Sequence, residues 1–186
     1  MLNELLLKTR SYRRFDERRR IPEADLLSLA EAARLCPSAA NMQRIKLAFV
    51  NKSLQCEKVF NTLGFAAYLK DWDGPVSGER PSAYVVLMSR ATPDLNIGID
   101  AGLVAEAVLL SAMERGIGGC IFRSFKESQL NEVLRKDGYN PILVIALGYP
   151  AERVVIEDVR GGDIKYYRDS EGVHHVPKYP VEEYII

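Results

Sequence analysis

Between Asp100 and Arg115 the chain reads Asp-Ala-Gly-Leu-Val-Ala-Glu-Ala-Val-Leu-Leu-Ser-Ala-Met-Glu-Arg. Its apolar residues recur at helical spacing and cover almost the whole circumference, which is typical of a helix buried at the centre of a domain. We therefore expect a helix over 101–115 with Asp100 as its N-terminal cap. The glycine-rich run 116–122 follows, turns the chain and leads into a strand.

Outward from this helix, short apolar runs alternate with amphipathic stretches. The apolar runs predict strands over 45–50, 83–88 and 141–147, in addition to the strand that ends at Phe122. Helical spacing predicts further helices over 3–9, 22–35, 53–69 and 127–135. The order is two helices, a strand, and then three helix–strand pairs. It predicts an α+β fold, a sheet with helices packed against both faces.

The chain is expected to form a single domain, 1–186, because 186 residues suit one domain and no low-complexity linker divides them. Residues after Tyr149 are polar and interrupted by prolines, so we expect an irregular C-terminal tail over 151–186. Gly161-Gly162 is a hairpin signal inside that tail. Whether the tail stays on its own subunit or reaches a partner is left open by the sequence.

Composition places the chain among ordinary globular proteins. It is 47% hydrophobic and 27% charged, and its 25 basic and 25 acidic residues give a formal net charge of zero. Proteins that coat nucleic acid usually have a strong basic excess, so no nucleic-acid partner is expected. No apolar run approaches the roughly 20 residues of a membrane span. The first residues lack an export signal, so we expect a cytoplasmic protein with no membrane partner.

Cysteines and histidines give no sign of a metal site. Cys36, Cys56 and Cys120 are odd in number and lie far apart, unlike a disulfide framework or a zinc motif. The only histidines, His174 and His175, are adjacent, and adjacent residues of a strand point to opposite faces. We expect no bound metal, and we expect the two histidines to hold the tail in place.

The first polar motif is Arg10-Ser-Tyr-Arg13, within a segment, 1–20, that has seven basic residues against three acidic ones. Residues three apart on a helical or tightly turned segment face the same way, so both guanidinium groups can converge with the Ser11 hydroxyl between them. Guanidinium groups offer paired donors that match phosphate oxygens. The motif alone also fits a solvated basic surface.

The second polar motif is Cys36-Pro-Ser-Ala-Ala-Asn-Met-Gln43. In extended geometry the amides of Asn41 and Gln43 face the same side, where their donors and acceptors suit the edge of a planar heterocycle. An ordinary polar turn explains the motif equally well. The glycines of 116–119 similarly suit close approach of a ligand or tight packing of the buried helix.

No dinucleotide-binding fingerprint and no phosphate-binding loop motif occurs in the sequence. The polar motifs nevertheless form an ordered series: Arg10-Ser-x-Arg13, Pro37-Ser-Ala-Ala-Asn-x-Gln43, Asp100 before an alanine-rich helix, Gly116-Ile-Gly-Gly-Cys120 and Ala146-Leu-Gly-Tyr-Pro150. This series resembles the nitroreductase family of FMN-dependent oxidoreductases over about residues 4–150.

The resemblance implies a homodimer of nitroreductase-like fold, with a central, mostly antiparallel sheet and two FMN molecules at the subunit interface. The positions that match segments at the FMN phosphate and ribityl chain are Arg10, Ser11 and Arg13, with Lys178 as a basic residue that returns to the phosphate. The positions that match a loop contributed by the partner are Pro37, Ser38, Ala39 and Asn41, with Gln43 beside it. The positions that match contacts with the flavin ring are Lys70 at the pyrimidine and Ile121, Phe122 and Arg123 near N5 and O4.

Two positions depart from the family pattern. Arg44-Ile45 stands where the family often has Pro-Trp, and Arg123 stands where Gly or Glu is common. If Arg123 points toward the ring, its charge favours an anionic reduced flavin and admits acidic substrates. If it points to solvent, that idea fails.

The activity that the resemblance implies is hydride transfer from NADH or NADPH to flavin N5, followed by transfer to an electron-poor acceptor such as a nitroaromatic or a quinone. The cofactor carries the chemistry, so no catalytic side chain is expected and the kinetics should be ping-pong. Two alternatives stay open: a flavin enzyme that does not use nicotinamide, such as a dehydrogenase or dehalogenase, and a non-catalytic FMN-binding protein. The sequence specifies neither the physiological acceptor nor the choice between NADH and NADPH.

Overall fold

A four-stranded antiparallel sheet forms the centre of the computed structural model, which describes residues 2–186. Its strands are β1 (Lys46–Val50), β2 (Ala83–Ser89), β3 (Gly118–Phe122) and β4 (Asn140–Gly148), in the order β1-β2-β4-β3. All four predicted strands are present, and the expected α+β class is confirmed.

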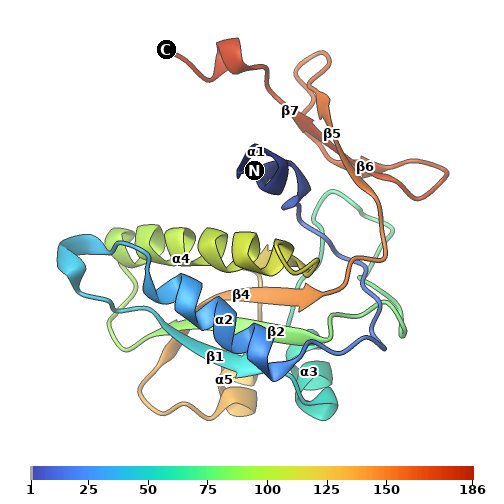
Figure 1. Cartoon of the computed structure of the whole chain (residues 1–186). Helices are drawn as coiled ribbons and strands as arrows, with labels where there is room; N and C mark the ends of the chain where they lie inside the picture. The colour runs from blue at the N-terminus through green and yellow to red at the C-terminus, as the bar shows by residue number, and fades with distance from the viewer. Residues whose placement is uncertain (1) are drawn as a thin grey trace.

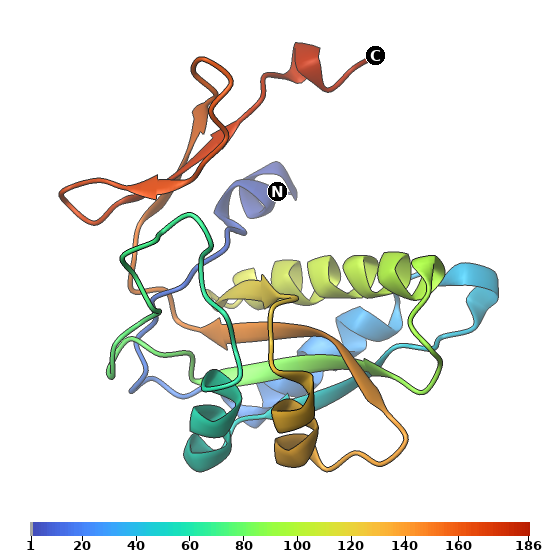
Figure 2. The same cartoon turned by 180° about the vertical axis from the view of Figure 1, so that it is seen from behind.

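Helices cover both faces of this sheet, as Figures 1 and 2 show from opposite sides. α2 (Glu23–Arg34) and α4 (Leu95–Met113) lie on one face, and α3 (Ser53–Phe60) and α5 (Glu127–Leu134) lie on the other. Successive residues of the central strand β2 alternate between the two cores, because side chains of a strand point to opposite faces. Val85 and Leu87 pack toward α4, whereas Tyr84 and Val86 pack toward α3 and α5.

The buried helix α4 begins six residues earlier than its apolar pattern predicts. The carboxylate of Asp94 accepts a hydrogen bond from the backbone N–H of Ile97 at 2.7 Å, so Asp94 is the cap. The expectation that Asp100 caps the helix is therefore wrong. Asn96 and Gly98 have weak helix propensity, so the sequence does not predict the first turn of the helix. The hydrogen bond from Ile97 to the Asp94 cap stabilises this turn despite the low propensity.

α4 is also the one helix among residues 2–186 that is long and apolar enough, by length and composition, to cross a membrane, with a mean hydropathy of 1.5. Its buried residues include Ile97, Ala101, Val108 and Ala112, which pack against α2 and the central sheet. Packing inside the domain thus accounts for much of its apolar character.

α3 is shorter than predicted and ends at Phe60, not Leu69. Beyond it, Leu63 forms an isolated antiparallel bridge with Phe125, and the backbone N–H of Gly64 donates to the carbonyl of Ser124 at 2.9 Å. A Cβ at Gly64 would lie 2.6 Å from the Ser124 hydroxyl. This tertiary pairing overrides the helical pattern of residues 61–69.

The C-terminal tail is ordered as a second sheet, so the expectation of an irregular tail is wrong. β5 (Val154–Asp158) pairs in parallel with β7 (His174–Lys178), and β6 (Tyr167–Arg168) pairs with β7 antiparallel. The expected turn lies at Gly161-Gly162, where both residues have positive φ. Figure 2 shows this small sheet beside α1 (Leu2–Lys8), away from the central sheet. Tertiary pairing between short polar strands leaves little trace in hydrophobic periodicity.

Candidate functional site

A cavity of about 310 Å³, the arginine cavity, lies between the N-terminal segment, α4 and the tail sheet. Its lining comprises Thr9, Arg10, Ser11 and Arg13, then Glu106 and Leu109 of α4, Ile121 of β3, and Tyr166, His174, Val176 and Lys178 of the tail. Five sequence-predicted site residues therefore meet in one place: Arg10, Ser11, Arg13, Ile121 and Lys178. The converging arginines favour a binding site over a solvated basic surface.

β3 holds the segment that carries the two arginines. Ser11 forms a parallel bridge with Gly119, and the backbone N–H of Tyr12 donates to the Gly119 carbonyl at 3.0 Å. A Cβ at Gly119 would lie 2.5 Å from Leu109 Cδ2 and 2.9 Å from the Ala146 carbonyl oxygen. This glycine therefore serves the close packing of α4 and β4 rather than the approach of a ligand.

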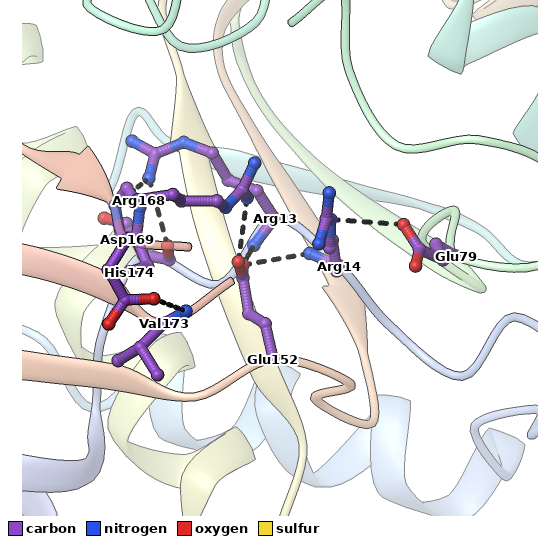
Figure 3. A network of polar contacts seen from close by, with 9 residues as sticks. Arg13, Arg14, Glu79, Glu152, Arg168, Asp169, Val173 and His174 are labelled. Carbon is purple, nitrogen blue, oxygen red and sulfur yellow. Dashed lines mark hydrogen bonds and ion pairs between the residues drawn. The ribbon is translucent and has the colours of Figure 1, made fainter. Parts of the chain in front are cut away.

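Glu152 also fixes this segment, and Figure 3 shows its contacts with Arg13 and Arg14. Its Oε1 accepts hydrogen bonds from the backbone N–H groups of Arg13 and, at 3.0 Å, Arg14. Its Oε2 accepts from Arg168 at 2.8 Å. The Glu152 side chain is only 1% exposed, so this carboxylate is a buried anchor whose charge is paired.

The Arg13 side chain runs toward the tail sheet. One guanidinium nitrogen lies 3.0 Å from His174 Nε2 and 3.3 Å from the Ser11 carbonyl oxygen. The guanidinium also lies over the Tyr166 ring, 4.7 Å from its centroid. Arg13 is thus fixed by the tail and still lines the arginine cavity.

His174 is fully buried and neutral at physiological pH. Burial lowers its pKa to about 4, with a further contribution from the nearby Arg13 cation. A guanidinium group only donates hydrogen bonds, so Nε2 must accept from Arg13 and the imidazole hydrogen must sit on Nδ1. Nδ1 is buried and has no hydrogen-bond partner among residues 2–186.

The donors of the arginine cavity suit an anionic group. Arg10, Arg13 and Lys178 face one acidic residue, Glu106, in the lining. Arg10 NH2 donates to the Leu6 carbonyl at 2.6 Å, but its Nε is buried and lacks a partner within the described chain. Unpartnered buried donors are costly and call for an acceptor. A phosphate fits this donor set.

The loop around Pro37 lies elsewhere. Pro37, Ser38 and Gln43 line a second cavity of about 310 Å³ beside Asp100 and the N-terminal half of α4. The backbone N–H of Ala39 donates to Asp100 Oδ1 at 3.0 Å. Within one chain, this loop and the arginine cavity do not form a single pocket.

The amides of Asn41 and Gln43 meet, but in a turn, so the assumed extended geometry is wrong. Gln43 Nε2 lies 3.2 Å from Asn41 Oδ1. Ala40, Asn41 and Gln43 have φ values of 50°, 53° and 49°, in the left-handed region. Positive φ at three residues other than glycine within one short loop is strained. The bond from Ala39 to Asp100 anchors the loop at the residue before Ala40.

Three further predicted residues lie outside the lining of the arginine cavity. Lys70 is exposed in the loop after α3, and its neighbour Tyr68 packs against Tyr166 with ring centroids 5.0 Å apart. Phe122 is buried with its ring against Phe65. Arg123 is exposed and lies over the Phe125 ring at 5.7 Å. Any role of these three in binding stays a prediction.

Sequence reasoning missed four residues that build the site: Glu152, Tyr166, Arg168 and His174. Arg168 lies over the Trp72 ring at 4.3 Å, so Trp72 anchors the loop between α3 and β2 to the tail sheet. No local motif marks these residues, because the pairing of the tail strands brings them together. His174 was expected only to hold the tail. No group of three metal-ligating side chains occurs among residues 2–186.

Comparison with solved structures identifies the fold. The structure is similar to the nitroreductase family protein of Streptococcus pneumoniae TIGR4, with a TM-score of 0.70, 19% identity, and 100% and 99% of the two chains covered. An FMN-dependent nitroreductase of Clostridium difficile R20291 gives a TM-score of 0.65 at 19% identity, covering 92% of this chain and 94% of that one. The FMN-dependent nitroreductase NfnB of Mycobacterium smegmatis, solved in complex with NADPH, gives a TM-score of 0.65 at 16% identity. The match covers 81% of this chain and 87% of that one.

No curated protein sequence matches the chain. At these identities the solved structures show the fold alone. The sequence model of the Nitroreductase family, however, matches residues 6–72 and 78–149, which is more than half of the chain. A nitroreductase-like fold and a family match over the same residues agree, and the chain belongs to the Nitroreductase family.

Proposed function

We propose that this protein is an FMN-dependent oxidoreductase that passes a hydride from NADH or NADPH to an electron-poor acceptor such as a nitroaromatic or a quinone. The observation that carries the proposal is the convergence of Arg10, Ser11, Arg13 and Lys178 on one cavity, where the buried Nε of Arg10 has no partner among residues 2–186. Membership of an oxidoreductase family supports it. Similar folds solved as FMN-dependent nitroreductases, one of them with NADPH, support it further.

In this proposal the arginine cavity holds the FMN phosphate. Arg10 and Arg13 offer paired donors, Ser11 offers a hydroxyl, and Lys178 adds a point charge. When bound, FMN supplies the two-electron chemistry at N5 of its isoalloxazine ring, so the protein needs no acid–base pair of its own. Ile121 presents an apolar side chain beside the phosphate donors, against which a bound flavin would pack.

A homodimer explains why the Pro37 loop lies apart from the arginine cavity. Leu95, Ile99 and Leu103 are 79%, 52% and 43% exposed and recur every fourth residue along α4, forming an apolar stripe on the N-terminal half of this helix. The Pro37 loop lies by the same half, whereas Glu106 and Leu109 of the cavity belong to the C-terminal half. A two-fold axis through the middle of α4 would place each loop near the partner's cavity.

The tail belongs to the same functional unit in this proposal. It contributes Tyr166, His174, Val176 and Lys178 to the cavity, so a single domain over 1–186 would be required for binding. We place the protein in the cytoplasm, where NADH and NADPH are available.

The test is a visible absorption spectrum of the purified protein, followed by anaerobic addition of NADH and then NADPH. We expect a yellow protein, or one that becomes yellow with FMN, and bleaching by at least one nucleotide. Arg13→Gln should weaken FMN binding, whereas Arg18→Gln should not, because Arg18 lies in the same segment but outside the arginine cavity. A yellow protein that neither nucleotide bleaches would indicate a flavin enzyme with another electron donor. A protein that stays colourless with added FMN would overturn the proposal.

A further inference from the structure

We propose that His174 is a positioning residue for the cofactor: its imidazole holds the Arg13 guanidinium in the orientation that binds the FMN phosphate. This inference rests on the proposed function and adds a role for the tail sheet in cofactor affinity.

The contacts of Arg13 show how far its side chain is already fixed. Its backbone N–H donates to Glu152, one guanidinium nitrogen lies 3.0 Å from His174 Nε2, and the guanidinium carbon lies over the Tyr166 ring. An arginine side chain has a large rotamer entropy, and a fixed guanidinium loses less of it when a ligand binds. Arg13 has five N–H donors, so the bond to His174 leaves others free for a phosphate.

A neutral histidine suits this position better than a charged residue. A carboxylate at the same place would hold Arg13 firmly, but it would cancel the positive charge and repel a phosphate. A lysine or arginine would repel Arg13. Neutral imidazole accepts a hydrogen bond from Arg13 and leaves the guanidinium charge available to the ligand.

The surroundings keep the imidazole neutral. The charged groups that act on His174 are Arg13, Arg168 and Glu152, together with His175. Burial and the cations disfavour the imidazolium, and Glu152 alone favours it. The acceptor at Nε2 is therefore present throughout the neutral pH range.

The position of His174 in the tail sheet couples the tail to the site. His174 is the first residue of β7 and Lys178 the last, and both line the arginine cavity. The backbone N–H of His174 donates to the Arg153 carbonyl at 2.9 Å, next to Glu152. The strand β7 therefore holds Arg13 through His174 and contributes a further cation, Lys178, to the arginine cavity.

The experiment compares FMN with riboflavin, which lacks the phosphate, by quenching of flavin fluorescence on binding. Wild-type protein should bind FMN more tightly than riboflavin. His174→Leu should reduce this preference roughly tenfold, the effect of losing one hydrogen bond to a charged group, with little change in riboflavin affinity. His174→Gln, whose side-chain oxygen can replace Nε2 as acceptor, should retain most of the preference.

His175→Gln is the matched control, because His175 is adjacent in β7 but bonds to Glu157 and Asp169 outside the arginine cavity. If the leucine variant does not fold, His174→Asn replaces it, because asparagine is too short to supply an acceptor at the position of Nε2. An unchanged preference in the folded leucine or asparagine variant would overturn the role of His174. Wild-type protein that binds neither flavin would instead overturn the proposed function.

Discussion

The carboxylate of Asp100, in the N-terminal half of the apolar helix α4, accepts a hydrogen bond from the backbone N–H of Ala39 at 3.0 Å. Asp100 is only 2% exposed, and its second oxygen has no partner among residues 2–186. A buried carboxylate with one unpartnered oxygen is costly, so its presence needs a compensating role. Its contact with the strained loop after Pro37 supplies that role.

We expect Asp100→Ala to destabilise the protein by about 1–2 kcal/mol. The Ala39 N–H loses its acceptor, and the removal of a costly buried carboxylate offsets part of that loss. Asp100→Asn keeps an acceptor oxygen and should be closer to wild type. Urea unfolding of the three proteins measures the difference. Equal destabilisation by the two substitutions would contradict the role assigned to the hydrogen bond.

Replacing each of two glycines by alanine should change the stability of the protein in opposite directions. Gly119→Ala should destabilise the protein by about 1–3 kcal/mol, because the new methyl group meets Leu109 and the Ala146 backbone oxygen. Gly102→Ala, where a Cβ meets nothing within 4 Å in a single chain, should stabilise the isolated subunit by about 0.5–1 kcal/mol. Denaturant midpoints of both variants provide the comparison, and a neutral Gly119→Ala would show that β3 can shift.

The two histidines should titrate on opposite sides of their ordinary pKa. The pKa of His174 is lowered to about 4 by burial, whereas hydrogen bonds to Asp169 and Glu157 raise the pKa of His175. Because the chain has only two histidines, an NMR titration of imidazole nitrogens should show two pairs of resonances, one pair for each ring, that change in separate pH ranges. His174→Gln and His175→Gln assign them. Coincident titrations would contradict the different environments of the two rings.

These shifts also set the pH dependence of stability. The raised pKa of His175 contributes stability that is complete below its unfolded value of 6.5 and is lost as pH rises through the folded pKa. The lowered pKa of Glu157 and Asp169, caused chiefly by the bond to His175, contributes stability that is lost as the solution becomes acidic. The lowered pKa of His174 also reduces stability as the pH falls below 6.5, because the imidazole binds a proton more readily in the unfolded chain than in the folded protein.

Thermal unfolding should therefore show that the melting temperature falls from pH 6 toward pH 9 more steeply in wild type than in His175→Gln. The melting temperature of His174→Gln should fall less than that of wild type as the pH is lowered from 6.5 to 4. Identical profiles for wild type and both variants would show that the tail sheet does not contribute to the measured transition.

The dimer proposal gives a prediction on α4. Ile99→Glu places a charge in the centre of the exposed apolar stripe of this helix, where a partner helix would bury it without a counter-charge. We expect a monomer by light scattering, with FMN affinity reduced because the partner's Pro37 loop is lost. Leu27→Glu, at an exposed apolar position of α2, is the control. A monomeric wild type would refute the proposed dimer.

Long periodic segments and ordered motifs made much of the molecule predictable. The strands β1, β2 and β4 and the helices α2 and α5 lie within a few residues of their predicted bounds, because burial imposes a period that the sequence displays. The convergence of Arg10, Ser11 and Arg13 was also predictable, since the three residues are local. The start of α4 and the end of α3 were not, because a cap at Asp94 and the pairing of Leu63 with Phe125 outweigh propensity.

The sequence by itself determined the α+β class, the family and the cations that could hold a phosphate, because these depend on periodicity, motif order and local spacing. Only the tertiary structure decided what holds those cations. Glu152, Arg168 and His174 reach the Arg13 segment from strands and loops more than 130 residues away along the chain. Their pairing depends on the register of β7 with β5 and β6, which short polar strands do not reveal in their sequence.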